Sequence, residues 1–185
     1  MVPLLRLGQV EEPMPAHNPN RPLRAVAVMV AVSALPSAAL ADPLARPTGP
    51  VVLTVTGTIA ETNAPGKAEF DMAMLEALGT DEVVTATEWT EGTPTWEGVR
   101  LSTVLSSVGA TGANIVATAR NGYSGEIGMD LIRNYPVLLA THVDGKPIPA
   151  DKAPLWIIYP VDAYPELLER DDMLWAWQLA TIDVR

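Results

Sequence analysis

The stretch Pro154-Leu155-Trp156-Ile157-Ile158-Tyr159-Pro160 decides the fold of this chain, together with Trp175-Ala176-Trp177-Gln178-Leu179, Ile182-Asp183-Val184 and Asp144-Gly145-Lys146-Pro147. A run of large apolar residues between two prolines predicts a short buried strand. The Asp-Gly pair predicts a hairpin turn, and the residues just before the C-terminal arginine predict a strand that closes the sheet. The C-terminal part of the chain is therefore predicted to consist of short strands and tight turns.

Further short strands and two small helices are predicted upstream. β-Branched residues predict a first strand over residues 51–57, and alternating side chains predict a half-buried strand over residues 83–89. Asp71 is the expected N-cap of a helix that ends at Gly79, and Ser102 is the expected N-cap of a second helix. Other strands are predicted at residues 115–120, 124–127 and 137–143, with Asn121-Gly122 as the turn between the first two. This mixture indicates the α+β class.

Composition and charge exclude several classes of function. The chain has 185 residues, which is enough for one domain and an extra segment. Its formal net charge of −10 opposes binding to nucleic-acid phosphates and to anionic membranes. The absence of cysteine excludes disulfides, iron–sulfur clusters, thiolate zinc sites and cysteine nucleophiles. No nucleic-acid partner is expected.

Residues 21–41 have the pattern of a secretory signal peptide. Arg21 and Arg24 precede an uncharged stretch, which ends in the small-x-small motif Ala39-Leu40-Ala41. We expect cleavage after Ala41, a periplasmic or secreted location, and no stable membrane span after cleavage.

The other segments are assigned from composition. Residues 1–20 contain a Glu-Glu pair and scattered prolines, and they are interpreted as a mis-assigned or non-structural leader. Residues 42–50 are interpreted as a proline-rich arm. Residues 51–185 are predicted to form the folded domain.

Several motifs of this domain occur in the order of a known family. They are Trp96-Glu97-Gly98-Val99-Arg100-Leu101, Asn121-Gly122-Tyr123, Leu139-Ala140 and Asp144-Gly145-Lys146-Pro147. In this order they resemble the molybdopterin-binding oxidoreductase domain of the sulfite oxidase type. The resemblance implies a mixed β-sheet, barrel-like domain with short helices, molybdopterin as the cofactor, and oxidoreductase activity.

Two stretches depart from the family pattern. The resemblance implies a molybdenum-binding cysteine where this chain has Thr87-Glu88-Trp89-Thr90, which offers no soft ligand. It also implies a basic stretch that binds the pterin phosphate, where this chain has Asp171-Asp172-Met173-Leu174-Trp175. Each of these carboxylates would repel a phosphate by about 1 kcal/mol or more at close range. The cofactor is therefore expected to be absent, and bound molybdopterin is the alternative.

Five residues are candidates for a remodelled ligand pocket. The resemblance implies that the loops bearing Trp89, Tyr123 and Tyr159 surround the family's cofactor pocket, with Arg120 and Asn121 beside Tyr123. An apolar cavity with a few polar groups is the usual form of a small-molecule site. The alternative for the aromatic members is packing in the core.

No catalytic or metal-binding residue is predicted. His142 is the one histidine after residue 41, and a lone histidine without cysteine does not make a zinc site. No Gly-x-Ser-x-Gly motif of a serine hydrolase is present. The acidic residues around Asp171 lack the spacing of a calcium loop and are interpreted as a solvated surface.

Three functions are compatible with these observations. The first is an exported domain that has lost molybdenum chemistry and acts as a small-ligand-binding or sensory accessory module. The second is a genuine periplasmic oxidoreductase that holds molybdopterin or another cofactor without a cysteine ligand. The third is a structural partner of a membrane-bound sensor or redox complex.

Overall fold

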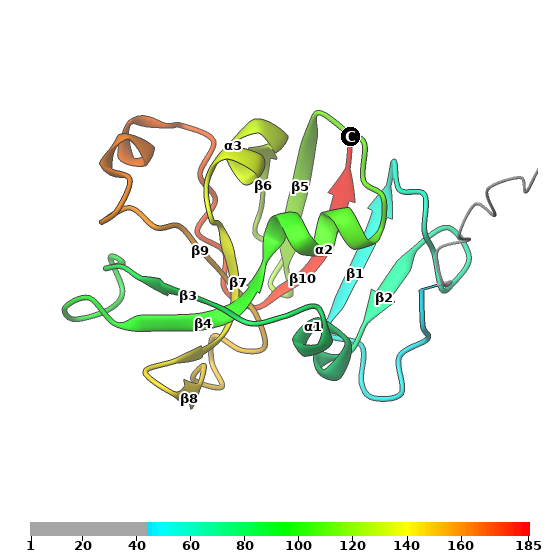
Figure 1. Cartoon of the computed structure of the whole chain (residues 1–185), viewed down its shortest axis with the longest axis horizontal. Coiled ribbons are helices and arrows are strands. Elements are labelled where there is room, and N and C mark those ends of the chain that lie inside the picture. The colour runs from blue at the N-terminus through cyan, green and yellow to red at the C-terminus, as the bar shows by residue number, and fades with distance from the viewer. Residues whose placement is uncertain (1–43) are drawn as a thin grey trace, which may run out of the picture. The chain divides into compact units, whose positions relative to one another are not determined.

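The computed structural model describes residues 44–185, so the predicted leader and signal peptide lie outside the described residues. No helix in this described part is long and apolar enough to cross a membrane. The elements, labelled in Figure 1, are β1 (Leu53–Gly57), β2 (Ala68–Phe70), α1 (Met72–Ala77), β3 (Asp81–Val84), β4 (Thr95–Arg100), α2 (Leu101–Ser107), β5 (Asn114–Ala119), β6 (Ser124–Gly128), α3 (Met129–Asn134), β7 (Leu138–Val143), β8 (Lys146–Pro147), β9 (Trp156–Ile158), the 3-10 helix η1 (Pro165–Glu169) and β10 (Leu179–Val184).

The described strands form two open sheets, not a closed barrel. The first sheet has the order β2-β1-β10-β5-β6, and the second has the order β3-β4-β7-β8 with β9 also paired to β7. The α+β class is therefore confirmed, whereas the barrel-like closure is not found in residues 44–185. Both sheets have free edges.

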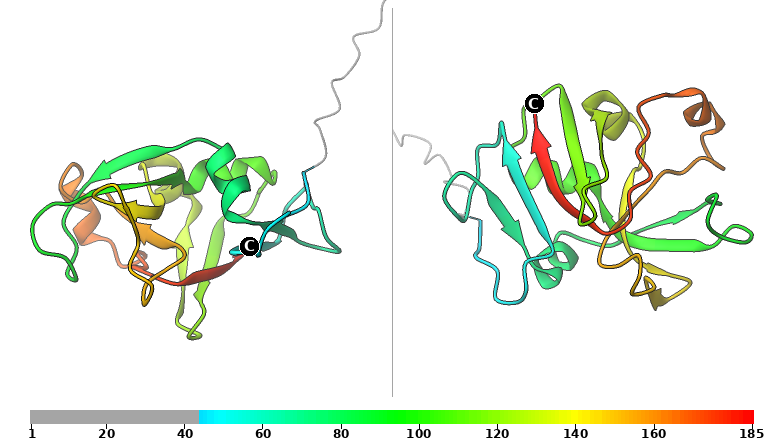
Figure 2. Two further views of the ribbon diagram at one scale, coloured as in Figure 1. Left: turned by 90° about the horizontal axis from the view of Figure 1, so that it is seen from below. Right: turned by 180° about the vertical axis from the view of Figure 1, so that it is seen from behind.

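The first and last strands of the domain lie side by side in the first sheet. β1 and β10 pair in parallel, with Thr54 opposite Thr181, while β10 and β5 are antiparallel. Figure 2 shows β10 between β1 and β5 when the molecule is seen from behind. The predicted closing strand is thus confirmed, and the sheet is mixed.

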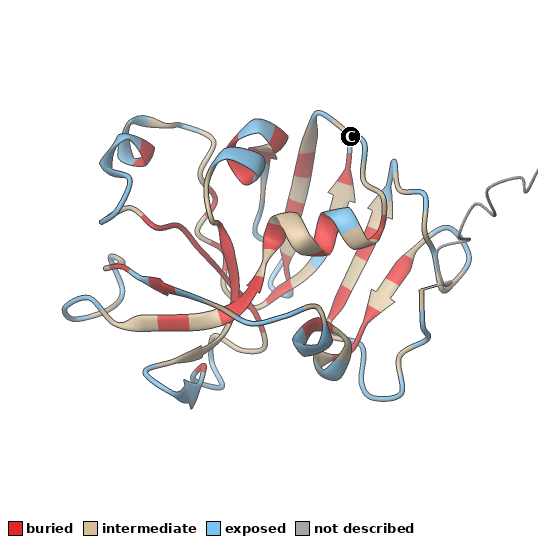
Figure 3. Cartoon of the chain, in the orientation of Figure 1, coloured by how far each residue is buried: buried red, intermediate tan, exposed pale blue. Residues whose placement is uncertain are grey.

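Two hydrophobic clusters hold the sheets and helices together. The larger one includes Val104 and Leu105 of α2 together with Ile115 of β5 and Ile182 of β10. The smaller one lies at the second sheet and contains Trp96 and Trp156. Figure 3 shows the buried residues along the strands of both sheets, while the connecting loops are largely exposed. The smaller, tryptophan-rich cluster adjoins the candidate site.

Gly98 allows β4 to pair closely with β7. A Cβ atom at this position would overlap the backbone carbonyl of Leu139. The register of β4 against β7 shifts between Glu97 and Gly98, which indicates a bulge at this point. The glycine of the Trp96-Glu97-Gly98 motif is therefore explained by the close pairing of two strands, independently of any cofactor.

The first predicted helix is confirmed, and its cap makes additional contacts. The Asp71 carboxylate accepts a hydrogen bond from the Met74 amide at 2.9 Å, as an N-cap does. It also accepts from the amides of Thr48 and Gly49, each at 2.7 Å. Asp71 thus fastens the predicted N-terminal arm to the domain.

Two predicted elements differ from the structure. The strand predicted over residues 83–89 ends at Val84, because Thr87 and Thr90 bond to each other and form a local turn instead of a ladder. The second helix begins at Leu101, not after a Ser102 cap, and the Leu101 amide donates to the carbonyl of Val137 at 2.9 Å. Four elements were not predicted, namely β2, β4, α3 and η1.

Candidate ligand pocket

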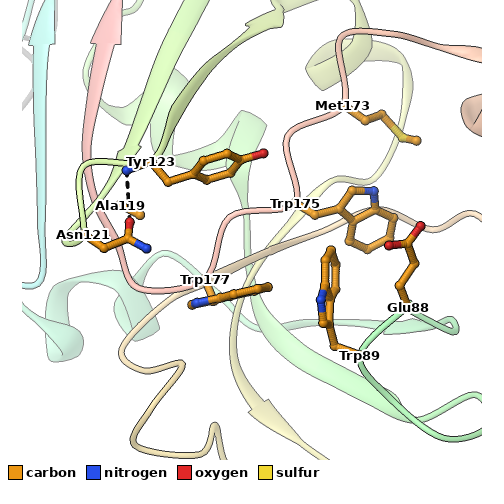
Figure 4. Close-up of a pocket in the computed structure, with 8 residues that line it drawn as sticks. All are labelled: Glu88, Trp89, Ala119, Asn121, Tyr123, Met173, Trp175 and Trp177. Atoms are coloured by element: carbon orange, nitrogen blue, oxygen red, sulfur yellow. Dashed lines mark hydrogen bonds between the residues drawn. The ribbon is translucent and has the colours of Figure 1, made fainter.

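A cavity of about 430 Å³ opens between three segments of the chain. These are the loop after β3, the turn between β5 and β6, and the extended stretch before β10. Figure 4 shows its lining side chains, which are Glu88, Trp89, Ala119, Asn121, Tyr123, Met173, Trp175 and Trp177.

A threonine-bonded turn holds Glu88 and Trp89 in the first wall. The hydroxyls of Thr87 and Thr90 lie 3.0 Å apart, and the Thr90 amide donates to the Thr87 carbonyl at 3.3 Å. The Trp89 amide donates to the Thr87 hydroxyl at 3.2 Å. Short polar side chains that bond to nearby backbone favour such turns over a strand. Trp89 stays 39% exposed at the edge of the cavity.

A tight hairpin turn supplies the second wall. Gly122 has a φ of 83°, a backbone conformation that glycine adopts without strain. The Asn121 side-chain oxygen accepts a hydrogen bond from the Tyr123 amide at 3.0 Å (Figure 4). Tyr123 is 55% exposed, and its ring points into the cavity. The predicted Asn-Gly turn therefore places an aromatic ring over the pocket.

The third wall is an extended stretch, residues 173–177, whose side chains alternate between the cavity and the core. Met173, Trp175 and Trp177 line the cavity, while the intervening Leu174 and Ala176 are buried. A period of two residues places alternate side chains on opposite faces of an extended segment. This stretch therefore turns a row of apolar side chains toward the pocket.

Tyr159 fixes this stretch from behind. Its hydroxyl accepts a hydrogen bond from the Leu174 amide at 3.1 Å and donates to the Leu174 carbonyl at 3.4 Å. Its ring packs edge-on against Trp175, with centroids 5.1 Å apart. Burial raises the pKa of the Tyr159 phenol well above its usual range, so the hydroxyl stays protonated and can donate.

The indoles around the cavity form a continuous cluster. Trp89 packs edge-on against Trp177 at 5.0 Å, and it lies 6.2 Å from Trp175 and 6.1 Å from Trp156. Such edge-on arrangements are the favoured geometry for aromatic pairs. On another side of the cluster, the Lys152 ammonium lies 4.8 Å from the centroid of the Trp156 ring. The cluster therefore already attracts one cation of the chain.

Glu88 is the charged side chain of the lining, and in the nearby acidic stretch Arg170 pairs with Asp172. Arg170 donates to Asp172 at 2.7 Å and to Asp130 at 3.2 Å. The hydrogen bond from Arg170 lowers the pKa of Asp172, so this carboxylate stays ionised. Arg170 is thus engaged with carboxylates and does not line the cavity.

Comparison with known families identifies the domain. Residues 55–161 match the model of the oxidoreductase molybdopterin binding domain. The chain belongs to this family. Comparison with curated proteins gives no match. The matched part of this molybdopterin-binding-domain protein ends before Met173, so the third wall of the pocket lies outside the match.

Of the five residues predicted to line the pocket, three line the cavity and two do not. Trp89, Asn121 and Tyr123 line one cavity, and their role in binding a ligand stays a prediction. Arg120 is exposed and does not line it. Tyr159 is completely buried behind Trp175, so its predicted place in the lining is wrong.

Sequence reasoning missed other members of the lining. They are Glu88, Ala119, Met173, Trp175 and Trp177. The alternation of residues 173–177 could have revealed the third wall. The sequence gives no comparable sign for Glu88, because its position depends on the turn that ends β3.

The lining does not fit the family's cofactor in the form that the resemblance implies. The chain contains no cysteine, and residues 44–185 contain no cluster of three or more His, Asp or Glu that could hold a metal. The loop that would carry the thiolate presents Glu88 and Trp89 instead. No cationic side chain lines the described cavity, whereas a phosphate needs cations.

Proposed function

We propose that this member of the molybdopterin-binding domain family has lost molybdenum chemistry and binds a small organic molecule in the tryptophan-rich pocket. One observation carries the proposal. Glu88 and Trp89 occupy the loop where the family resemblance implies the metal-binding cysteine, and Trp89 packs against Trp177 there at 5.0 Å. An indole and a carboxylate replace the soft ligand, so the space serves for contact with a ligand and not for holding the metal.

The cavity has the properties of a small-molecule site. Its volume of about 430 Å³ falls within the common range for such sites, roughly 300–1,000 Å³. Four of its eight lining residues are aromatic, and Asn121 and Glu88 add polar groups. A mainly apolar wall with few polar groups gives both burial and orientation of a ligand.

We also propose that the domain works outside the cytoplasm as a sensory or accessory module. The support is the signal-peptide pattern of residues 21–41 and the small residues at Ala39 and Ala41. N-terminal sequencing of the protein from its own host is expected to begin at Asp42. An intact Met1 or Met14 in the exported material would contradict this.

Metal and cofactor analysis of protein purified from its own host tests the main proposal. Elemental analysis is expected to find no stoichiometric molybdenum, and oxidation of the extract is expected to release no fluorescent pterin. Native mass spectrometry is expected to detect a small bound molecule.

Two other results would favour the competing functions. Stoichiometric molybdenum together with a pterin would establish the second candidate, an oxidoreductase without a cysteine ligand, which the family match favours. Neither metal nor ligand, with a co-purifying membrane protein, would favour the role of a structural partner.

A further inference from the structure

We propose that the tryptophan-rich pocket binds the quaternary or methylated ammonium group of a small, freely diffusing molecule. This inference deepens the proposed ligand-binding function and rests on it. The rings of the pocket, its charge and its few hydrogen-bond acceptors all favour such a group.

The rings surround one space from several directions. Trp89, Trp175, Trp177 and Tyr123 come from all three walls, and Figure 4 shows Tyr123 across the cavity from Trp175, with Trp177 below Tyr123 in this view. The face of an aromatic ring carries negative electrostatic potential. A cation within about 6 Å of several such rings gains from each of them, and this arrangement is how proteins recognise quaternary ammonium groups.

The charge of the pocket favours a cation over other ligands. Glu88 contributes a carboxylate, and no Lys, Arg or His is among the described residues that line the cavity. The chain as a whole carries a net charge of −10, which attracts cations and repels anions. An anionic or phosphorylated ligand would meet no cation in this lining.

Lys152 shows that the same cluster accepts a cation at the rings. Its ammonium lies 4.8 Å from the centroid of Trp156 and 5.8 Å from that of Trp177. Lys152 does not line the cavity, so its side chain leaves the space between Tyr123 and Trp175 open. Trp177 therefore belongs both to an internal cation–π contact and to the wall of the open pocket.

The lining offers few side-chain hydrogen-bond acceptors to a primary ammonium or a metal ion. A primary ammonium has three N–H donors to satisfy, and a metal ion needs several oxygen, nitrogen or sulfur ligands. The side-chain acceptors of the lining are the Glu88 carboxylate, the Tyr123 hydroxyl and the Asn121 oxygen, and the last already accepts one hydrogen bond from the Tyr123 amide. A trimethylammonium group needs no hydrogen bonds, and its methyl groups bury apolar surface against the rings.

A free molecule fits better than a lipid headgroup. In a phosphocholine lipid the ammonium is followed by a phosphate, which would lie near Glu88 without a cation from the lining. Choline is therefore the appropriate probe, and vesicles of phosphatidylcholine test the other source.

Titration of tryptophan fluorescence with choline chloride tests the inference. Choline is expected to cause a saturable change, because three indoles line the cavity. The uncharged carbon analogue of choline, in which a tert-butyl group replaces trimethylammonium, has the same shape and is expected to bind at least about tenfold more weakly. Vesicles of phosphatidylcholine are expected to cause no change.

Matched variants assign the binding to this pocket. Tyr123→Leu is expected to weaken choline binding about tenfold, and Glu88→Gln by a few fold. The controls are Tyr164→Leu and Glu91→Gln, which change an exposed tyrosine and an exposed glutamate outside the lining. Both controls are expected to bind choline as the unchanged protein does. Circular dichroism verifies that all variants are folded.

Several results would overturn the inference. They are no saturable change with choline, equal binding of the uncharged analogue, equal loss in the control variants, or a response to vesicles alone. The metal analysis is independent of this titration. If the protein contains no molybdenum and does not bind choline, the proposed ligand class is wrong but the proposed function stands. If the protein contains bound molybdenum, the proposed function itself is wrong.

Discussion

Trp89 is a predicted pocket residue that also lines the observed pocket. It packs beside three other indoles, while 39% of it remains exposed. Replacement of a fully buried tryptophan by alanine typically costs about 3–5 kcal/mol, and partial exposure lowers the cost at Trp89 to about 2 kcal/mol. Trp89→Ala is therefore expected to stay folded and to lose ligand binding. Urea unfolding and fluorescence titration measure the two effects.

Trp89→Phe is the matched control, because it keeps an aromatic ring at this position. It is expected to retain part of the binding and most of the stability. If Trp89→Ala bound the ligand normally, the first wall would have no role in the pocket.

Tyr159 acts on the pocket through Leu174 and does not contact the space itself. Tyr159→Phe removes the hydroxyl and leaves the Leu174 amide buried without its partner at 3.1 Å. The loss of such a bond typically costs about 1–3 kcal/mol, which denaturant unfolding can measure. Tyr164→Phe, at an exposed position, is the control and is expected to change stability little. Equal stability of the two variants would contradict the anchoring role of Tyr159.

At the scale of elements, the Asp71 cap joins the N-terminal arm to α1 and gives a pH dependence. Hydrogen bonds from the amides of Gly49 and Met74 lower the pKa of Asp71 below its ordinary value of 3.8. Because the pKa is lower in the folded state, the contribution of Asp71 to stability is present above pH 3.8 and is lost as the pH falls through the lowered value.

The variant Asp71→Asn isolates this contribution. Its melting temperature is expected to lie below that of the unchanged protein at neutral pH, and the difference is expected to shrink as the solution becomes more acid than pH 3.8. Asp151→Asn changes an exposed carboxylate and serves as the control. A difference between the unchanged protein and Asp71→Asn that stayed constant through this range would contradict the role of the ionised carboxylate.

The elements that sequence reasoning predicted are those with local signals. The cap at Asp71 and the turn at Asn121-Gly122 depend on residues close in sequence, and both are confirmed. β4 was missed because its pairing depends on β3 and β7 and on the missing side chain of Gly98. The end of β3 was placed too late because the Thr87–Thr90 turn competes with alternation. Long-range pairing therefore decided the error at β4, whereas a competing local turn decided the error at β3 and hid Glu88.

At the scale of the whole molecule, the pocket connects the two sheets. Trp89 follows β3 of the second sheet, while Ala119 and Tyr123 belong to the β5–β6 hairpin of the first. The third wall leads from η1 into β10. A ligand that contacts all three walls must be released when either sheet unfolds, so binding is linked to the stability of the entire domain.

This linkage predicts a thermal shift with choline as the ligand. At a free concentration about one hundred times the Kd, a ligand that binds only the folded protein stabilises it by about 2.7 kcal/mol. Differential scanning calorimetry is expected to show one transition that moves to higher temperature as choline increases. Tyr123→Leu is expected to show a much smaller shift at the same concentration, and Tyr164→Leu the full shift, because only the first removes a ring of the pocket. A second transition that choline leaves in place would show that the sheets unfold separately and that the pocket does not couple them.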